Sequence, residues 1–338
     1  MPLTHYPHGI FATPLIGGSD GGYDRLMTLW NSSNIWFVDG DLGSASNAGN
    51  EPDHSVALIS TAISKASIGA VIYVKPRQLA TAVQTYYQDT IVVPITLSNL
   101  TIIGAGNPGS NSGVQVKPAD VTTHLIDVKA PGLTLENMRL TLNGGTADLK
   151  MSIVHAVNAT AVTTPAGLVI RDCRFEGDKS VPSITSSTDM CSSIALGTCN
   201  YTTIENNVFY SCHGGIVAQL STAAYHNLII RGNIFSGAVA NRALDVWLST
   251  GTTGGTEIIG NIFGDGLPTH AGGTGGNYFL KITGDGSGSI VNNAFATATL
   301  SFGAAGSQAI FPATFFSMGN TYSAASAGTT TSGIFGTS

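Results

Sequence analysis

Four ionisable side chains occupy similar points in short apolar segments that are spaced along the sequence. They are Asp127, His155, Asp245 and Lys281. If these segments are strands lying side by side, the four side chains could line one outward face. A carboxylate next to an imidazole can transfer protons, and two carboxyl groups roughly 5 to 9.5 Å apart can hydrolyse a glycosidic bond. Intervening segments carry Ala and Leu at this point, so a subunit contact or a solvated face is the favoured interpretation, with a catalytic cluster as the alternative.

A second set of charges precedes a bulky apolar residue by four positions in successive repeats of the sequence. The set consists of Glu136, Arg171, Glu205 and Arg231. In a stack of parallel strands these side chains form a column of alternating sign, with neighbours about 4.8 Å apart. We interpret the column as a charge ladder that helps to fix the register of the strands, each exposed pair contributing about 0–1 kcal/mol. A carbohydrate-binding stripe is the alternative.

The repeat that places these residues consists of an apolar segment, a turn containing Asn or Gly, and a bulky apolar residue. The clear copies are 133–140, 168–175, 202–209, 228–235 and 256–263, and the weaker ones are 289–295 and 316–322. Each interval between copies contains another short apolar segment. Strands of this length cannot bury an apolar face alone, whereas stacked coils cover one another. The pattern predicts an all-β solenoid, a parallel β-helix of about seven to eight coils.

Asparagine stands two positions before the bulky residue in five of the seven copies. These residues are Asn207, Asn233, Asn261, Asn293 and Asn320. Asparagine tolerates a left-handed backbone conformation and forms local hydrogen bonds. Repeated once per coil, the amides would stack about 4.8 Å apart and bond to one another. Separate hairpins that happen to use Asn in their turns are the alternative.

The composition narrows the classes of function. Of 338 residues only 10% are charged, and the formal net charge is −6. This argues against a nucleic-acid partner, which needs clustered Lys and Arg, and against a solvated helical bundle. We expect no membrane partner and no signal peptide, because no long apolar stretch and no basic region before an apolar run occur. The four cysteines match no zinc-binding spacing, so we expect reduced thiols and no metal. They are Cys173, Cys191, Cys199 and Cys212.

The repeated phrase resembles the right-handed single-stranded β-helix of the pectate-lyase-like superfamily, over residues 91–323. Many members of that superfamily are polysaccharide lyases or hydrolases. The polygalacturonase-like motifs Asn-Thr-Asp, Asp-Asp, Gly-His-Gly and Arg-Ile-Lys are absent from this sequence, and so is a pectate-lyase-like Trp-x-Asp-His. The nearest approach is Cys-His-Gly-Gly at 212–215. We therefore expect no enzymatic activity, no catalytic residue and no cofactor.

The same resemblance divides the chain into four parts. Residues 1–33 form a docking arm, 34–90 contain entrance strands and a capping helix, 91–323 form the β-helix, and 324–338 are a flexible Gly/Ser/Thr-rich tail. The capping helix would present one apolar face to the first coil, with Asp53 as its N-cap and Gly69 as its C-cap. That face would consist of Val56, Ile59, Ile63 and Ala66.

The arm carries apolar side chains that so short a segment cannot bury alone. Those assigned to capsid attachment are Leu3, Tyr6, Ile10, Phe11 and Leu15. The opening phrase at 3–10 resembles the start of bacteriophage head-associated proteins, and the phrase at 38–44 resembles the entrance of phage β-helix proteins. The resemblance implies a virion protein, made in the host cytoplasm, that decorates the capsid. Its arm would dock on the major capsid protein, and its β-helix would project and stabilise the shell.

Other partners and functions remain open at this point. The resemblance implies a homotrimer, because three solenoids with few charges can pack side by side with cyclic symmetry. A host surface glycan is a further candidate partner. The first alternative function is a tailspike- or fibre-type adhesin or polysaccharide depolymerase, attached to a tail protein. The second alternative is an intracellular carbohydrate-active β-helix enzyme.

Overall fold

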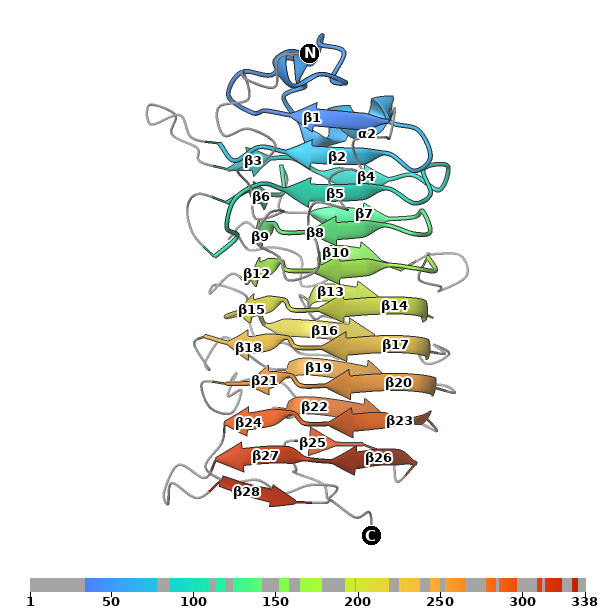
Figure 1. Ribbon diagram of the computed structural model, residues 1–338. Helices are drawn as coiled ribbons and strands as arrows, with labels where there is room; N and C mark the ends of the chain where they lie inside the picture. The colour runs from blue at the N-terminus through green and yellow to red at the C-terminus, as the bar shows by residue number, and fades with distance from the viewer. Residues whose placement is uncertain are drawn as a thin grey trace.

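The chain forms a right-handed parallel β-helix, as the repeat and its resemblance predicted (Figure 1). This computed structural model describes residues 34–77, 86–109, 113–119, 124–141, 152–157, 165–177, 192–197, 199–218, 225–237, 244–249, 253–264, 278–283, 286–296, 309–311, 314–323 and 330–333. Within these ranges no helix is long and apolar enough to cross a membrane.

Three sheets run along the solenoid, and we call them sheets A, B and C. Sheet A holds β1 (Ile35–Val38), β2 (Val71–Val74), β5 (Thr101–Gly104), β8 (Thr134–Glu136), β11 (Val169–Arg171), β14 (Cys199–Glu205), β17 (Tyr225–Arg231), β20 (Thr253–Ile259), β23 (Gly286–Val291) and β26 (Phe315–Met318). Sheet B holds β3 (Tyr87–Gln88), β6 (Gln115–Lys117), β9 (Arg139–Thr141), β12 (Arg174–Glu176), β15 (Val208–Tyr210), β18 (Ile234–Ser236), β21 (Ile262–Phe263), β24 (Ala294–Ala296), β27 (Asn320–Ser323) and β28 (Thr330–Gly333). Sheet C holds β4 (Ile91–Val93), β7 (Ile126–Val128), β10 (Ser152–Ala156), β13 (Ser192–Leu196), β16 (Gly214–Ala218), β19 (Leu244–Ser249), β22 (Tyr278–Thr283) and β25 (Ala309–Ile310). Successive coils each give one strand to A, B and C in turn, and the eight strands of sheet C agree with the predicted seven to eight coils.

The core consists of columns of identical or similar apolar side chains. The bulky residues of the repeat point inward from sheet B, where Phe175, Phe209, Phe235, Phe263 and Phe295 are all buried. Their rings stack with centroids 4.6 to 5.0 Å apart. The spacing of the rings is that of the strands, because a parallel register repeats each position once per coil.

The turn from sheet A to sheet B differs from the sequence interpretation in one respect. The sequence placed the left-handed backbone on the stacked asparagines, but the residue before each of them adopts it, with φ between 55° and 66°. Asn, Asp and Gly occupy this preceding position, because these residue types tolerate positive φ. They are Asn206, Gly232, Gly260, Asn292 and Gly319, and, before Met138 and Cys173 in two earlier coils, Asn137 and Asp172. The residue before each stacked asparagine therefore makes the bend, and the asparagine itself can point its side-chain amide inward.

At both ends of the solenoid, the structure differs from the division of the chain into four parts that the sequence predicted. β1 and β2 belong to sheet A, so the expected entrance strands are continuous with the body. The helix α2 spans Ile59–Lys65, its N-cap is Leu58, and Asp53 lies in a separate 3₁₀ turn, η4 (Pro52–His54). At the other end β28 pairs antiparallel with β27, inside the segment expected to be a flexible tail. The pairing covers the open edge of the last parallel strand, which would otherwise expose its hydrogen-bonding groups.

Candidate functional site

Three of the four ionisable residues predicted to line one face, Asp127, His155 and Lys281, do so on the outside of sheet C, and Trp247 takes the place of the fourth, Asp245. The parallel register of successive strands places one residue of each strand beside the next, and we call this row of residues the sheet C column. It consists of Val92, Asp127, His155, Ala195, Val217, Trp247 and Lys281. Asp245 does not belong to this column: Trp247 takes the place opposite Lys281, and Asp245 is buried with 2% of its surface exposed. The prediction that Asp245 lies at the same point as Lys281 is therefore wrong, because the register of β19 places Trp247 there.

One end of the column is a cluster of two histidines, an aspartate and a lysine. Nδ1 of His155 lies 3.2 Å from Oδ1 of Asp127, and Nζ of Lys129 lies 3.2 Å from the other carboxylate oxygen. The rings of His124 and His155 stack with centroids 3.8 Å apart. The backbone N–H of Ser152 donates to Nδ1 of His124. The strand pairing of β7 and β10 thus holds an imidazole directly against a carboxylate.

The surroundings in this cluster shift the pKa values of His124 and Asp127. Burial lowers the pKa of His124 to about 4, and the neighbouring His155 acts in the same direction. Burial alone would raise the pKa of Asp127, but its hydrogen bonds with His155 and Lys129 outweigh this effect and hold it below its usual value. A carboxylate that stays ionised can orient the imidazole of His155 for proton transfer at its other ring nitrogen. The pair can therefore serve as a base or as a hydrogen-bonding site for a polar ligand.

The other end of the column is aromatic and cationic. Leu244, Trp247 and Tyr278 pack together on the outside of sheet C, separate from the main core. Nζ of Lys281 lies 4.4 Å from the Trp247 ring centroid and 5.0 Å from that of Tyr278. The small side chain of Ala195 separates His155 from Val217 and Trp247, and three strand spacings put the two ends roughly 14 Å apart. The His155–Asp127 cluster and the Trp247–Lys281 group therefore lie on the same face but do not contact each other.

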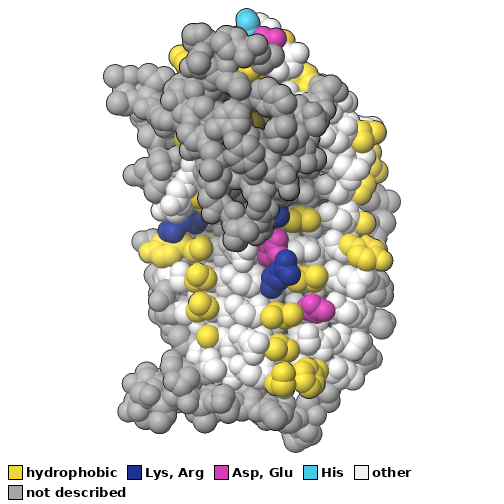
Figure 2. Space-filling view, in the orientation of Figure 1, with side chains coloured by type: hydrophobic (Ala, Val, Ile, Leu, Met, Phe, Trp, Pro, Cys, Tyr) yellow, Lys and Arg dark blue, Asp and Glu magenta, His cyan; other side chains and the backbone are white. Residues whose placement is uncertain are grey.

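The charge ladder on sheet A lies in register, as two ion pairs. Nη2 of Arg171 is 2.9 Å from Oε2 of Glu136, and Nε of Arg231 is 2.6 Å from Oε2 of Glu205. The register also places Arg171 beside Glu205 on the next strand, while the short contacts join Arg171 to Glu136 and Arg231 to Glu205. Charged side chains lie in the middle of the face in Figure 2, and hydrophobic side chains lie below them. Each acid is matched by a base, which favours a register-fixing role.

The five stacked asparagines form a continuous hydrogen-bonded row inside the A–B turn. Each Nδ2 donates to Oδ1 of the asparagine in the next coil, at 2.9 to 3.0 Å, in the pairs from Asn207 to Asn320. Each Nδ2 also donates to a carbonyl of the preceding coil, and all five residues are buried. The row contributes stability and register and has no free polar atom to offer a ligand.

Sequence reasoning missed three polar groups. On sheet B, Glu176 accepts hydrogen bonds from Arg139 at 2.9 Å and Arg174 at 2.6 Å, and these bonds hold its pKa below the usual range although burial opposes them. These residues flank the bulky residue of the repeat, so aligning that position would have found them. Lys129 follows Asp127 by two residues and shares its face by the period of a strand. His124 lies outside the strand, and no sequence signal identifies it.

A buried ion pair at the first coil was also missed. Nζ of Lys75 lies 2.6 Å from Oδ2 of Asp39, and both side chains are buried. The hydroxyl of Tyr87 donates to the Lys75 carbonyl and accepts from the Gly40 N–H, and burial raises the pKa of Tyr87. The group joins β1, β2 and β3 at the entrance and leaves little room for a ligand. We assign it a structural role.

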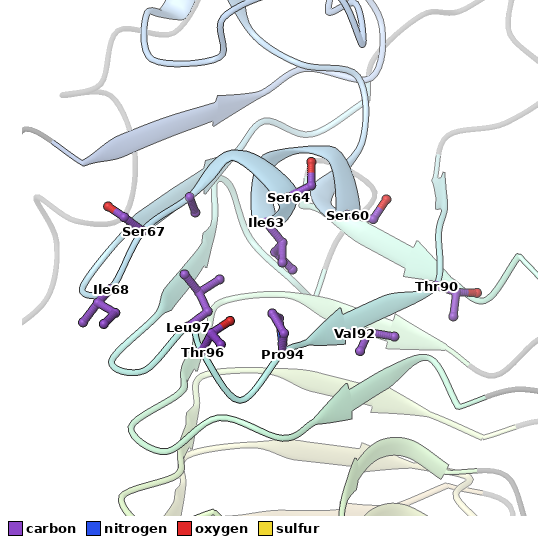
Figure 3. A pocket seen from close by; sticks show the side chains of 11 residues that line it. Ser60, Ile63, Ser64, Ser67, Ile68, Thr90, Val92, Pro94, Thr96 and Leu97 are labelled. Atoms are coloured by element: carbon purple, nitrogen blue, oxygen red, sulfur yellow. The ribbon is translucent and has the colours of Figure 1, made fainter.

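A groove of about 630 Å³ lies beside α2, between the helix and the turn that follows β4 (Figure 3). Its floor includes Ile63, Val92, Pro94 and Leu97, and Ser and Thr hydroxyls lie at its rim. None of its eleven lining residues is ionisable, so these residues cannot carry out acid–base chemistry.

Other expected site residues lie outside the described part of the chain. This applies to the capsid-attachment residues Leu3, Tyr6, Ile10, Phe11 and Leu15, and to Cys191. Cys173 and Cys212 are buried thiols. Within the described ranges no group of three or more His, Cys, Asp or Glu is placed to hold a metal ion.

Comparisons with known proteins add little to this description. No family model matches the sequence, and no curated protein matches it significantly. One similar solved structure is a rhamnogalacturonan lyase, with a TM-score of 0.35 and 15% identity over 79% of this chain and 69% of that chain. So distant a likeness carries no argument about activity. The assignment of this chain to the right-handed parallel β-helix fold rests on its own three sheets.

Proposed function

We propose that this protein is a structural virion protein of a bacteriophage that decorates the capsid. The observation that carries the proposal is the place where the arm joins the body. Asn34 and β1 lie at one axial end of the β-helix, so this end of the rod is where the expected arm is attached (Figure 1). An arm at this point can dock on the major capsid protein while the solenoid stands away from the shell. The phage-like phrase at 3–10 supports the same assignment.

The body suits a projecting role. Rows of asparagine amides and phenylalanine rings continue from coil to coil, so each coil is held to the next by polar and apolar contacts. Solenoids of this kind gain stability from nearest-neighbour contacts. We propose that three such bodies associate side by side as a homotrimer on the particle.

Localisation on the particle tests the proposal. Purified heads should carry the protein in many copies, and deleting residues 1–20 should abolish its binding to heads while the circular-dichroism spectrum of the body stays unchanged. As a matched control, deleting the tail residues 334–338 should leave head binding intact. Finding the protein only on tails would refute the decoration function.

A tailspike-like adhesin or depolymerase is the second candidate, and the His155–Asp127 pair on an open strand face favours it. Incubation with host surface polysaccharide would then release reducing ends or unsaturated sugars. Asp127→Asn and His155→Gln should each abolish the release, whereas Asp53→Asn, in the exposed η4 turn, should not. Binding without release would support an adhesin, and neither binding nor release would remove this candidate.

A further inference from the structure

The indole of Trp247 has a buried donor without an acceptor. Its side chain is 9% exposed, yet within the described part of the chain Nε1 has no hydrogen-bond partner. The indole of Trp36, by contrast, donates to Oδ1 of Asn34 at 2.8 Å. Buried donors in native structures are nearly always paired, because leaving one unpaired costs its full desolvation. An unpaired indole N–H on the outside of a sheet therefore points to a missing acceptor.

The ammonium of Lys281 lies against the same indole, and among the described residues it has no acidic partner. Its Nζ sits over the rings of Trp247 and Tyr278, and no carboxylate of the described chain comes within ion-pair distance. Burial alone lowers the pKa of Lys281. On the same face, Lys129 is paired with Asp127 at 3.2 Å. Lys281 is thus a half-buried cation held by aromatic rings in place of a counter-ion.

We propose that Trp247 and Lys281 form a binding site for the carboxylate of a small organic acid or sugar acid. One oxygen would accept from Nε1 of Trp247 after the flexible Lys281 side chain lifts from the ring, and the ammonium would pair with the charge. An ionised carboxylate fits because it offers acceptors only and matches a cation. Trp247 lies between Val217 and Lys281 in the sheet C column and only 9% of it is exposed, so the site would admit only a small group. The site does not depend on the proposed location on a virion.

The experiment observes the indole N–H signals of the full-length protein by NMR. The chain has three tryptophans, so three indole signals are expected, and Trp247→Phe identifies the one from this site. Acetate, a hexuronate and the matched neutral hexose are titrated at constant ionic strength. The Trp247 signal should shift saturably with the acids and not with the hexose, while the Trp36 signal stays fixed. Saturation by acetate as readily as by hexuronate identifies a simple carboxylate site, and a response to hexuronate alone identifies a sugar-acid site.

A pair of lysine variants separates this site from general charge effects. Lys281→Gln should weaken binding by about tenfold or more, because the charged partner of the carboxylate is lost. Lys129→Gln removes a cation from the same face but should leave the affinity unchanged. Two results would overturn the proposal: a Trp247 signal that does not move with either acid, or an equal affinity in Lys281→Gln and the wild type.

Discussion

Asn292 and Asn293 are adjacent in the chain but have different roles. Asn292 is exposed and makes the bend, with φ of 55°, whereas Asn293 is buried and donates to the Ile258 carbonyl and to Oδ1 of Asn320. We expect Asn292→Gly to change the free energy of unfolding by less than about 1 kcal/mol, because glycine adopts this φ freely. Asn293→Ala should cost about 3 kcal/mol, because it leaves several buried groups without partners.

Chemical denaturation and hydrogen exchange across β20 to β27 compare the two variants. The loss in Asn293→Ala should be greatest in the coils on either side of the substitution, because contacts in a solenoid are between neighbours. An Asn293→Ala protein as stable as the wild type would show that the row contributes nothing to stability.

His124 makes stability depend on pH in a defined window. Its pKa falls from 6.5 to about 4 in the folded protein, mainly through burial and then through His155. The unfolded chain therefore binds a proton that the folded chain does not between these values, and stability must fall as the pH drops from about 6.5 towards 4. The thermal midpoint should decline in this range, and less in His124→Gln. His54→Gln, at an exposed histidine, serves as the control and should decline like the wild type.

At the scale of the element, the helix α2 depends on a residue from a distant loop. Oδ2 of Asp89 accepts from the backbone N–H of Ser60 at 2.9 Å, and Leu58 at the N-cap provides no side-chain bond. Asp89→Ala should lower stability by about 1–2 kcal/mol, the usual cost of losing a cap. Asp89→Asn keeps an acceptor and should recover part of the loss.

Hydrogen exchange of the α2 amides reports on this change directly. Exchange should quicken in Asp89→Ala and stay at the wild-type rate in Asp53→Ala, because Asp53 lies in a separate turn. Equal exchange in the two variants would mean that the contact from Asp89 does not hold the helix.

Sequence periodicity predicted the elements that repeat in every coil. It failed for elements whose position depends on a single contact with a residue far away in the sequence. The bulky residues and the asparagine row recur once per coil, so their spacing alone gives the β-helix. Asp89 caps α2 across a gap of 29 residues, which no local pattern encodes. Asp245 was misplaced because counting from the start of a segment does not give the register of β19. β28 was missed because its Gly/Ser/Thr composition is typical of a loop, although an open strand edge favours pairing.

At the scale of the whole molecule, the lower half of one long face carries exposed hydrophobic side chains and few charges (Figure 2). Hydrophobic side chains gather in two columns over the lower half of the face seen in Figure 2. On sheet B this part of the face includes exposed Ile234 and Ile262, and on sheet A it includes exposed Phe316 and Met318. The columns rise by the same strand spacing in every copy of the chain, so two copies laid side by side can interlock over several coils. We assign the contact of the proposed homotrimer to this face.

Substitutions on this face test the assignment. Ile262→Asp combined with Met318→Asp would place charges in the centre of the contact, and the molar mass measured by light scattering should fall from the trimer to the monomer. Ile68→Asp is the matched control: Ile68 is 64% exposed beside α2, away from the face, and its substitution should leave the mass unchanged. Circular dichroism should be the same for all variants, since each changes an exposed side chain. A double variant that remains trimeric would move the contact to another face, and a wild type that is monomeric in solution and on the particle would remove the homotrimer itself.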